Sequence, residues 1–224
     1  MKNDSIQSLN DLTLKINEIY YSLQGESTHS GRPCIFIRLT YCNLRCTYCD
    51  TEYAFYEGKE MNLSEILDEV KRYHCNLVEI TGGEPLIQKN VLPLMQMLCD
   101  HDFEVLLETA GHMDISAIDP RVKKIMDIKC PSSGESKKTL WKNIDFLKMG
   151  DEIKFVVGTQ EDFKFSRQII EKYELPSRCQ ILISPVFDKI SNQEIAEWIL
   201  QNHLPVRMQI QLHKVIWDPS ARRV

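Results

Sequence analysis

Short apolar runs alternate with amphipathic stretches along most of the chain. In 63–74, Ile66, Leu67 and Val70 share one helical face, and Asn62 with Glu65 forms a capping box in which Asn replaces Ser or Thr. Runs that predict strands lie at 35–40, 77–81, 103–108, 124–128, 153–157, 180–184 and 206–212. Stretches that predict helices lie at 63–74, 91–102, 138–149, 161–173 and 193–202.

This alternation is typical of a mainly parallel sheet built from βα units. No low-complexity linker divides the chain, so we expect one α/β domain over residues 1–224, with 1–13 as a loosely ordered N-terminal extension. The fold class that follows is a partial (β/α) barrel. In such a fold, ligands bind where the parallel strands end, because the loops converge at that edge.

Composition and charge restrict the classes of molecule that this protein is expected to bind. With 43% hydrophobic residues in 224, the chain can bury a sizeable core. Its net charge of -5 disfavours binding to nucleic acid or to a membrane surface, and favours a small-molecule substrate. The polar N-terminus lacks a secretory apolar core, and no stretch approaches the roughly 20 apolar residues of a membrane span. We therefore expect a cytoplasmic protein.

Three cysteines form the most informative motif. Cys42, Cys46 and Cys49 have the spacing Cys-x3-Cys-x2-Cys directly after the first predicted strand. Three thiolates on one loop can hold three irons of a 4Fe–4S cluster and leave the fourth iron open. Zinc is the alternative, but it normally takes four ligands, and the nearest further donors, His74 and Cys75, fall at the end of a helix predicted to lie elsewhere. The other cysteines are scattered and are interpreted as small hydrophobic residues: Cys34, Cys75, Cys99, Cys130 and Cys179.

A second motif, Thr81-Gly82-Gly83-Glu84-Pro85, follows the second predicted strand. Paired glycines let a ligand approach the main chain, Glu84 could hold an ammonium group, and Pro85 could open a helix. Alone, such a segment is more often a structural turn. Together with the cysteine loop, it resembles the radical S-adenosylmethionine (SAM) superfamily. In that superfamily SAM chelates the open iron through its amino and carboxylate groups, and an electron from the cluster cleaves it to a 5′-deoxyadenosyl radical.

Further motifs resemble one family within that superfamily. They are Tyr20-Tyr21-Ser22-Leu23-Gln24-Gly25-Glu26, Phe36-Ile37-Arg38-Leu39, Cys49-Asp50-Thr51 and Gln211-Leu212-His213-Lys214. The chain is similar to 7-carboxy-7-deazaguanine synthase from about residue 16 to its end. The resemblance implies a lyase that converts 6-carboxy-5,6,7,8-tetrahydropterin to 7-carboxy-7-deazaguanine with loss of ammonia, in the synthesis of queuosine-type precursors.

The resemblance also implies site residues. It assigns no catalytic side chain beyond the cofactors and names Thr51 as a Mg²⁺ ligand. Substrate contacts are implied for Leu23, Gln24, Gly25, Glu26, Arg38, Thr81, His213 and Val224. SAM contacts are implied for Tyr48, Asp50, Gly82, Gly83, Glu84, Asp127, Ile128, Lys129, Ser184, Pro185, Val186 and Phe187.

The chemistry of several of these residues agrees. The planar guanidinium of Arg38 suits a carboxylate, the amide of Gln24 can both donate and accept at a pterin edge, and Glu26 can pair with guanidine-like N–H groups. Other roles stay open for three residues: Thr51 as a turn cap, Lys129 as a solvated strand end, and His213 as a packed strand residue.

Two segments depart from the family pattern. Some members carry Gln where this chain has Ser184, and many end in Arg-Gly-Val where this chain ends in Arg222-Arg223-Val224.

The implied partners are a flavodoxin or ferredoxin as electron donor and a second copy of the chain in a homodimer. Two rival functions remain: a radical SAM activating enzyme that acts on a partner protein, and a zinc-stabilised binding domain without catalysis.

Overall fold

The computed structural model describes residues 11–224. The predicted N-terminal extension, 1–13, therefore lies outside the described residues except for its last three. Of these, Leu12 packs against the hydrophobic core and Thr13 begins the first strand.

The described chain forms one sheet of nine strands in the order β3-β1-β2-β4-β5-β6-β7-β8-β9. From β2 to β9 every neighbouring pair is parallel, whereas β1 pairs antiparallel with both β2 and β3. The strands are β1 Thr13–Leu23, β2 Pro33–Leu39, β3 Lys59–Asn62, β4 Leu77–Gly82, β5 Glu104–Thr109, β6 Lys123–Asp127, β7 Glu152–Val157, β8 Gln180–Pro185 and β9 Arg207–Met208. The expected mainly parallel α/β fold is confirmed.

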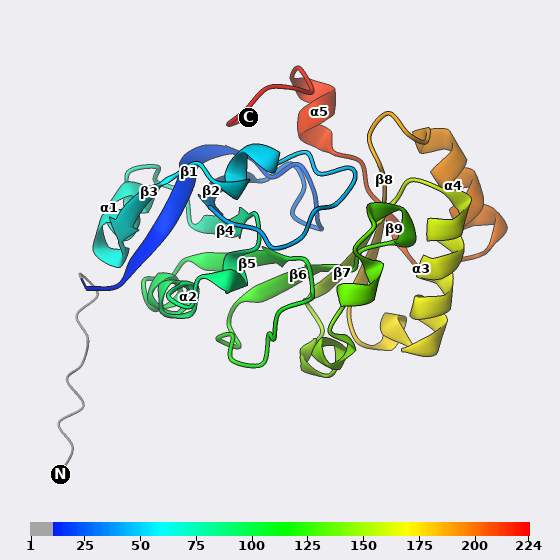
Figure 1. The fold of residues 1–224 in the computed structure, drawn as a ribbon, viewed down its shortest axis with the longest axis horizontal. Coiled ribbons are helices and arrows are strands. Elements are labelled where there is room, and N and C mark those ends of the chain that lie inside the picture. Colours follow the sequence, from blue (N-terminus) through cyan, green and yellow to red (C-terminus); the bar gives the residue numbers. More distant parts are fainter. Residues whose placement is uncertain (1–10) are drawn as a thin grey trace, which may run out of the picture.

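Helices cover the sheet in chain order (Figure 1). Helix α1 packs against β1 and β3, α2 against β5, α3 against β7, and α4 against β8 and β9. The α-helices are α1 Leu63–Lys71, α2 Val91–Asp100, α3 Gln160–Lys172, α4 Asn192–Gln201 and α5 Leu212–Ile216. Short 3₁₀ helices are η1 Glu52–Phe55, η2 Pro85–Ile87, η3 Pro131–Ser133, η4 Ser136–Lys138, η5 Trp141–Phe146 and η6 Leu175–Ser177.

The hydrophobic core lies between these helices and the sheet. Ile66, Leu67 and Val70 of α1 are buried in it, as their shared face predicts. The predicted capping box is also present: Glu65 N–H donates to Asn62 Oδ1 over 2.9 Å, and Asn62 N–H donates to Glu65 Oε2 over 2.9 Å.

Two strands, β1 and β3, were not predicted. Along β1 the buried positions alternate strictly, but one of them is the polar Glu18, which hides the period-two pattern in the sequence. Strand β3 is short and mostly exposed, and only pairing with β1 fixes it. Strands β1 and β3 extend the parallel sheet beyond β2, and β3 forms the outermost strand on that side.

The helix predicted at 138–149 is wrong. The segment holds only the 3₁₀ helix η5, in which Asn143 is fully buried. The Asn143 amide donates to the carbonyls of Gly111 and Met113 and accepts from Ile115 N–H. The side chain of Asn143 thus ties this segment to the loop between β5 and β6, a tertiary contact that helical periodicity does not reveal.

The strand predicted at 206–212 is largely wrong. Only Arg207–Met208 forms strand β9, and the chain then turns into α5, where Leu212 N–H donates to the carbonyl of Gly25 over 2.9 Å. His213 therefore sits on a helix rather than on a strand. Helix α5 and the chain end lie above the loops that follow β2 and β4 (Figure 1).

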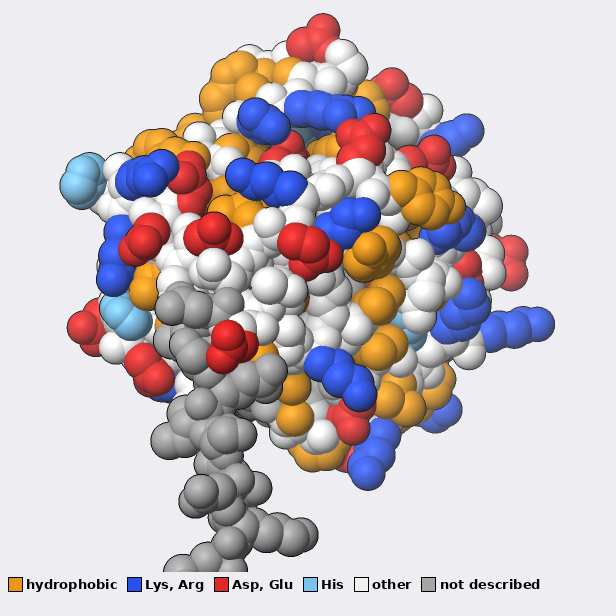
Figure 2. All heavy atoms as spheres, turned by 60° about the vertical axis from the view of Figure 1, so that its left-hand side comes forward, with side chains coloured by type: hydrophobic (Ala, Val, Ile, Leu, Met, Phe, Trp, Pro, Cys, Tyr) orange, Lys and Arg blue, Asp and Glu red, His pale blue; other side chains and the backbone are white. Residues whose placement is uncertain are grey.

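The molecular surface carries mixed charge. On the face seen in Figure 2, Lys and Arg side chains alternate with Asp and Glu, without a continuous basic field. None of the described helices is long and apolar enough to cross a bilayer.

Candidate active site

A cavity of 730 Å³ opens at the carboxyl ends of the parallel strands. It is lined by loops that follow β1, β2, β4, β5, β6, β7 and β8, and by α5 with the chain end. All but two of the residues predicted for the site lie in its wall: Leu23, Gln24, Gly25, Glu26, Arg38, Cys42, Cys46, Tyr48, Cys49, Asp50, Thr51, Thr81, Gly82, Gly83, Asp127, Lys129, Ser184, Pro185, Val186, Phe187, His213 and Val224. The two exceptions are Glu84 and Ile128.

The cysteine loop places three free thiols, those of Cys42, Cys46 and Cys49, in the cavity wall. Among residues 11–224, no three His, Cys, Asp or Glu side chains converge on one point as a single metal ion would need. Separate irons of a 4Fe–4S cluster can each take one thiolate, whereas a structural zinc ion normally takes four ligands. Burial raises the pKa of all three thiols, that of Cys46 to about 11, so binding of the cluster must displace their protons.

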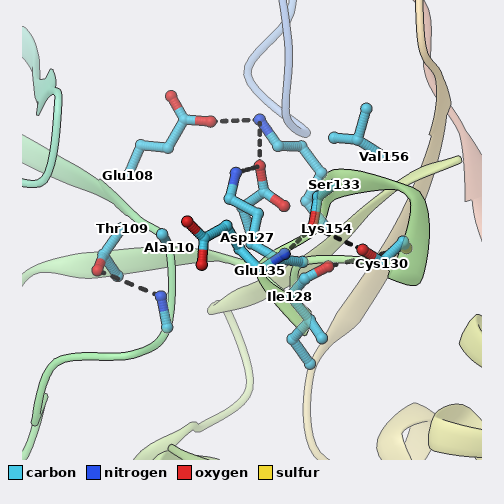
Figure 3. A network of polar contacts seen from close by, with 12 residues as sticks. Glu108, Thr109, Ala110, Asp127, Ile128, Cys130, Ser133, Glu135, Lys154 and Val156 are labelled. Atoms are coloured by element: carbon cyan, nitrogen blue, oxygen red, sulfur yellow. Dashed lines mark hydrogen bonds and ion pairs between the residues drawn. The ribbon is translucent and has the colours of Figure 1, made fainter. Parts of the chain in front are cut away.

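The loop after β6 holds the cysteine loop in place. Thr47 N–H donates to the carbonyl of Ser133 over 3.1 Å, and Arg45 N–H donates to Glu135 Oε1 over 2.6 Å. The loop after β6 is thus a support of the cysteine loop. Within that loop the Ser133 hydroxyl donates to the Cys130 carbonyl over 2.6 Å (Figure 3).

The glycine turn after β4 lies directly against the cysteine loop. A Cβ at Gly83 would lie 2.1 Å from the Tyr41 carbonyl oxygen and 2.8 Å from Cys42 Cβ. Glu84 N–H donates to the same Tyr41 carbonyl over 2.8 Å. Only glycine fits at position 83, and it leaves the main chain open toward a ligand at the cluster.

Glu84 itself does not line the cavity. Its carboxylate is fully buried and accepts from Leu86 N–H at 3.1 Å, from Ala110 N–H at 2.8 Å and from the Thr109 hydroxyl at 2.9 Å. Glu84 therefore joins the glycine turn to the end of β5, and the expectation that it holds an ammonium group has no support in this geometry. Ile128 is also fully buried, and its N–H donates to the Lys154 carbonyl.

A network of charges crosses the floor of the cavity. Lys154, on β7, contacts Glu26 at 2.8 Å, and Lys129 donates to Asp127 Oδ2 over 2.8 Å. Figure 3 shows the contact of Lys154 with Glu108. Burial alone would lower the pKa of Lys154, but the carboxylates of Glu108, Glu26 and Asp127 outweigh it and hold that pKa well above its usual value. The other Asp127 oxygen, Oδ1, is buried without a hydrogen-bond partner among the described residues, which leaves an acceptor for a ligand.

Gln24 and Glu26 shape the end of β1. Gln24 donates to Glu79 and accepts from Glu26 N–H over 2.6 Å, so protein groups occupy much of the amide expected to contact a pterin. Glu26 accepts from Gln209 and Gln211, each over 3.0 Å. Burial would raise the pKa of Glu26, yet Lys154 and Gln211 keep it below the usual value, so Glu26 stays ionised.

The Gln-Leu-His-Lys segment connects this strand end to the cysteine loop. Gln211 donates to Glu26 and also to Asp50 Oδ2 over 3.2 Å, and Lys214 pairs with the same Asp50 oxygen at 2.9 Å. A Cβ at Gly25 would lie 2.1 Å from His213 Nδ1, so Gly25 is the residue that lets α5 pack here. Burial lowers the pKa of His213, which favours a neutral ring in the cavity wall.

Arg38 occupies the opposite wall, on β2. Its Nε donates to Glu18 Oε1 over 2.9 Å and its Nη2 to the Tyr20 hydroxyl over 3.2 Å. A guanidinium has five N–H donors, so further donors remain for an anion in the cavity. Thr51 lies nearer the cysteines, where its hydroxyl donates to Asp50 Oδ1 over 3.0 Å and makes no cap to η1. The Thr51 oxygen can therefore accept or ligate.

Apolar and tail residues complete the wall. Tyr48 donates to the Val156 carbonyl over 3.3 Å, and Ser184 is buried in the cavity wall. Lys129 is no solvated strand end, because its side chain is only 16% exposed.

Several charged residues of the cavity wall were not predicted, among them Glu79, Glu108 and Lys154 on the strands of the sheet. These three residues lie within or at the end of the apolar runs that form β4, β5 and β7. A charged residue in such a run is costly to bury without a partner, and this was the signal in the sequence that could have identified them. Burial and the neighbouring Glu108 and Glu26 raise the pKa of Glu79 well above its usual value.

The fold and the three-thiol loop are those of the radical SAM class of enzymes, whose sequence model, "Radical SAM superfamily", matches residues 36–132. A 7-carboxy-7-deazaguanine synthase of Chlorobaculum tepidum is 43% identical over 94% of this chain and 97% of its own length. One from Koribacter versatilis is 42% identical over 94% of this chain and 100% of its own length. The chain belongs to the 7-carboxy-7-deazaguanine synthase family.

A solved structure shares the fold. The crystal structure of QueE from Escherichia coli aligns with a TM-score of 0.76 at 24% identity, over 90% of this chain and 95% of that one. Its similarity concerns the arrangement of strands and helices. Radical SAM membership implies a 4Fe–4S cluster and SAM, and the three free thiols, the Gly83 approach and the unpartnered Asp127 oxygen fit these groups.

Proposed function

We propose that this chain is a radical SAM lyase that converts 6-carboxy-5,6,7,8-tetrahydropterin to 7-carboxy-7-deazaguanine with loss of ammonia. One observation carries the proposal: the cavity that holds the three thiols also holds Arg38 on one wall and the carboxylates of Glu26 and Glu108 on another. The substrate has a carboxylate and a guanidine-like edge, and these groups complement the two walls.

The cluster and SAM, when bound, supply the electron and the 5′-deoxyadenosyl radical that removes a hydrogen atom from the substrate. The protein residues bind and orient. Cys42, Cys46 and Cys49 would hold the cluster, Gly83 admits SAM to the open iron, and Asp127 Oδ1 offers an acceptor to a donor of SAM.

Arg38 and Thr51 would position the substrate carboxylate. Arg38 is held by Glu18 and Tyr20, and its remaining N–H groups suit a carboxylate. The Thr51 oxygen makes no helix cap and would be available to a Mg²⁺ ion, since Mg²⁺ prefers hard oxygen ligands and retains waters. Thr81, whose hydroxyl donates to Glu108 over 3.2 Å, would orient the acceptor side of the pterin.

Glu26 and Glu108 would accept hydrogen bonds from the guanidine-like edge of the pterin. Lys154 holds both carboxylates in place, because its ammonium group lies between them, and it keeps the pKa of Glu26 below its usual value. Gln24 aligns the backbone of Leu23 and Gly25 beside them, and His213 closes the cavity over Gly25. The wall from Ser184 to Phe187, with Tyr48, would hold the adenosine part of SAM.

We further infer a flavodoxin or ferredoxin as the electron donor, a homodimer as the assembled form, one domain over the whole chain and a cytoplasmic location. The mixed surface charge supports a small-molecule substrate rather than nucleic acid or a membrane surface (Figure 2).

The test is anaerobic turnover. Reconstituted protein is incubated with SAM, dithionite and 6-carboxy-5,6,7,8-tetrahydropterin, and product is identified by mass spectrometry. We expect 7-carboxy-7-deazaguanine and ammonia. An enzyme that cleaves SAM yet forms no deazaguanine would remove the proposed substrate. Arg38→Ala should bind the substrate at least about tenfold more weakly with the cluster intact, given about 1.5–3 kcal/mol for a charged hydrogen bond.

A further inference from the structure

The last six residues of the chain, 219–224, form a segment that we term the C-terminal tail. All six line the cavity. The tail comes from α5 at the far end of the sequence, yet it returns to the wall formed by β1 and β2 (Figure 1).

Two arginine side chains fasten the tail to that wall. Arg223 Nε donates to Glu18 Oε2 over 3.2 Å, and the guanidinium of Arg222 lies 3.8 Å from the centre of the Tyr53 ring. Arg223 has a φ of 64°, a left-handed conformation that a side chain adopts at some cost and glycine adopts freely. An Arg placed there in this conformation needs a compensating contact, and Glu18 provides it.

Glu18 serves two guanidinium groups at once. Its side chain is only 4% exposed, Oε1 accepts from Arg38 and Oε2 accepts from Arg223. The Tyr53 hydroxyl also donates to Oε1 over 3.1 Å. Tyr53 therefore contacts both anchoring groups of the tail: its hydroxyl contacts Glu18, and its ring contacts Arg222.

One buried carboxylate faces two guanidinium groups in this region. Arg38 and Arg223 share the carboxylate of Glu18, and the guanidinium of Arg222 lies over the ring of Tyr53, whose hydroxyl donates to Glu18. An anionic ligand beside Arg38 would add the missing negative charge and reduce the repulsion between the guanidinium groups. Binding of an anion and closure of the tail should then favour each other.

We propose that Glu18 is a positioning residue that couples Arg38 to the C-terminal tail, so that the tail closes over the cavity as Arg38 takes up a substrate carboxylate. The identity of that carboxylate rests on the proposed function. The contact between Glu18 and Arg223, in contrast, is a property of the ligand-free chain. The two parts can therefore be tested separately.

The first arm uses ligand-free protein and carboxypeptidase Y. The rate of release of Val224 is followed by mass spectrometry in the native chain, in Glu18→Gln and in Arg72→Ala. Glu18→Gln leaves the tail sequence unchanged, so the protease meets the same peptide. Arg72 forms an exposed pair with Glu69 on α1, away from the cavity, and serves as the matched control.

We expect Glu18→Gln to release Val224 about three to ten times faster than the native chain, since an ion pair with one exposed partner contributes modestly. Arg72→Ala should match the native rate. For variants of Arg223, the release rate is divided by the rate from a free peptide of the same tail sequence. By this measure, Arg223→Lys should restore much of the protection that Arg223→Ala loses. Equal release from native and Glu18→Gln proteins would overturn the proposal.

The second arm adds 6-carboxy-5,6,7,8-tetrahydropterin, with tetrahydropterin lacking the carboxylate as control. Only the carboxylated ligand should slow release of Val224, and Arg223→Ala should raise KM for it more than it lowers kcat, although Arg38 is unchanged. An unaltered KM in Arg223→Ala would refute the coupling. If neither pterin protects the native chain while the ligand-free difference persists, the proposed substrate fails and the fastening by Glu18 stands.

Discussion

Removal of the buried ammonium group of Lys154 tests the electrostatic design of the cavity. Lys154 is 5% exposed and lies against Glu26 and Glu108, with Asp127 Oδ2 at 3.9 Å. Lys154→Met keeps the aliphatic length of the side chain but leaves these carboxylates facing one another. Breaking a buried ion pair on one side costs about 3–5 kcal/mol, so we expect a loss of that size in the free energy of unfolding at pH 7.5.

The pH dependence gives the sign of the effect. In the native chain Lys154 holds the pKa of Glu26 below its usual value, and this contribution to stability is present above the unfolded pKa of a glutamate and is lost as the pH falls. In Lys154→Met this compensation is lost, so the pKa of Glu26 rises, and lowering the pH neutralises Glu26 in the folded state. The difference in unfolding free energy between the two proteins should therefore shrink as the pH falls from 7.5 to 5.

The assay is urea denaturation of the metal-free proteins across that range. Lys123→Met is the matched control, because Lys123 pairs with Glu104 at 2.5 Å while 39% of its side chain is exposed. A surface pair of this kind contributes at most about 1 kcal/mol, with little change over this pH range. A loss in Lys154→Met that is no larger than in Lys123→Met, or that does not vary with pH, would refute the reasoning.

Three further substitutions test other parts of the site. Cys46→Ala should lose the visible iron–sulfur absorption and SAM cleavage, whereas Cys75→Ala, outside the cavity, should keep both; a fully active Cys46→Ala would place the cluster elsewhere. Gly83→Ala should bind markedly less iron per chain, because its Cβ would meet the Tyr41 carbonyl at 2.1 Å, while Gly31→Ala, with nothing within 4 Å of its Cβ, should bind iron normally. Burial, with Lys138 and Lys129, lowers the pKa of His112 to about 4, so the native chain should lose about 1 kcal/mol of stability between pH 7 and 5 that His112→Gln does not lose. Parallel pH profiles of the native and His112→Gln chains in urea titrations would contradict this assignment.

Much of the fold could be predicted from the sequence because parallel strands buried on both faces leave continuous apolar runs. Strands β2 and β4–β8 were predicted from such runs, and helices α1–α4 were predicted from amphipathic stretches. Strand β1 was missed because Glu18 occupies a buried position in its alternation, and that residue proves to hold Arg38 and Arg223. The segment 138–149 has helical periodicity, but buried Asn143 uses its side chain for contacts far along the chain.

The site was predictable where a short motif carries the chemistry. The cysteine loop and the glycine turn lie side by side as expected. Most other residues of the cavity wall were predicted from the resemblance to the family. The roles of Glu84 and Gln24 were less accessible, since a carboxylate or amide in a motif can serve the backbone as readily as a ligand. The pairing of Glu26 and Glu108 through Lys154 joins the loop after β1 to strands β5 and β7, which are far apart in sequence, and no local pattern encodes it.

The most direct test of this account is a crystal structure of the reconstituted protein, grown without oxygen with SAM and 6-carboxy-5,6,7,8-tetrahydropterin. We predict a 4Fe–4S cluster on Cys42, Cys46 and Cys49, with SAM on the fourth iron and the pterin carboxylate at Arg38. A protein side chain bound to the fourth iron, or a single zinc ion on the three thiolates, would contradict it.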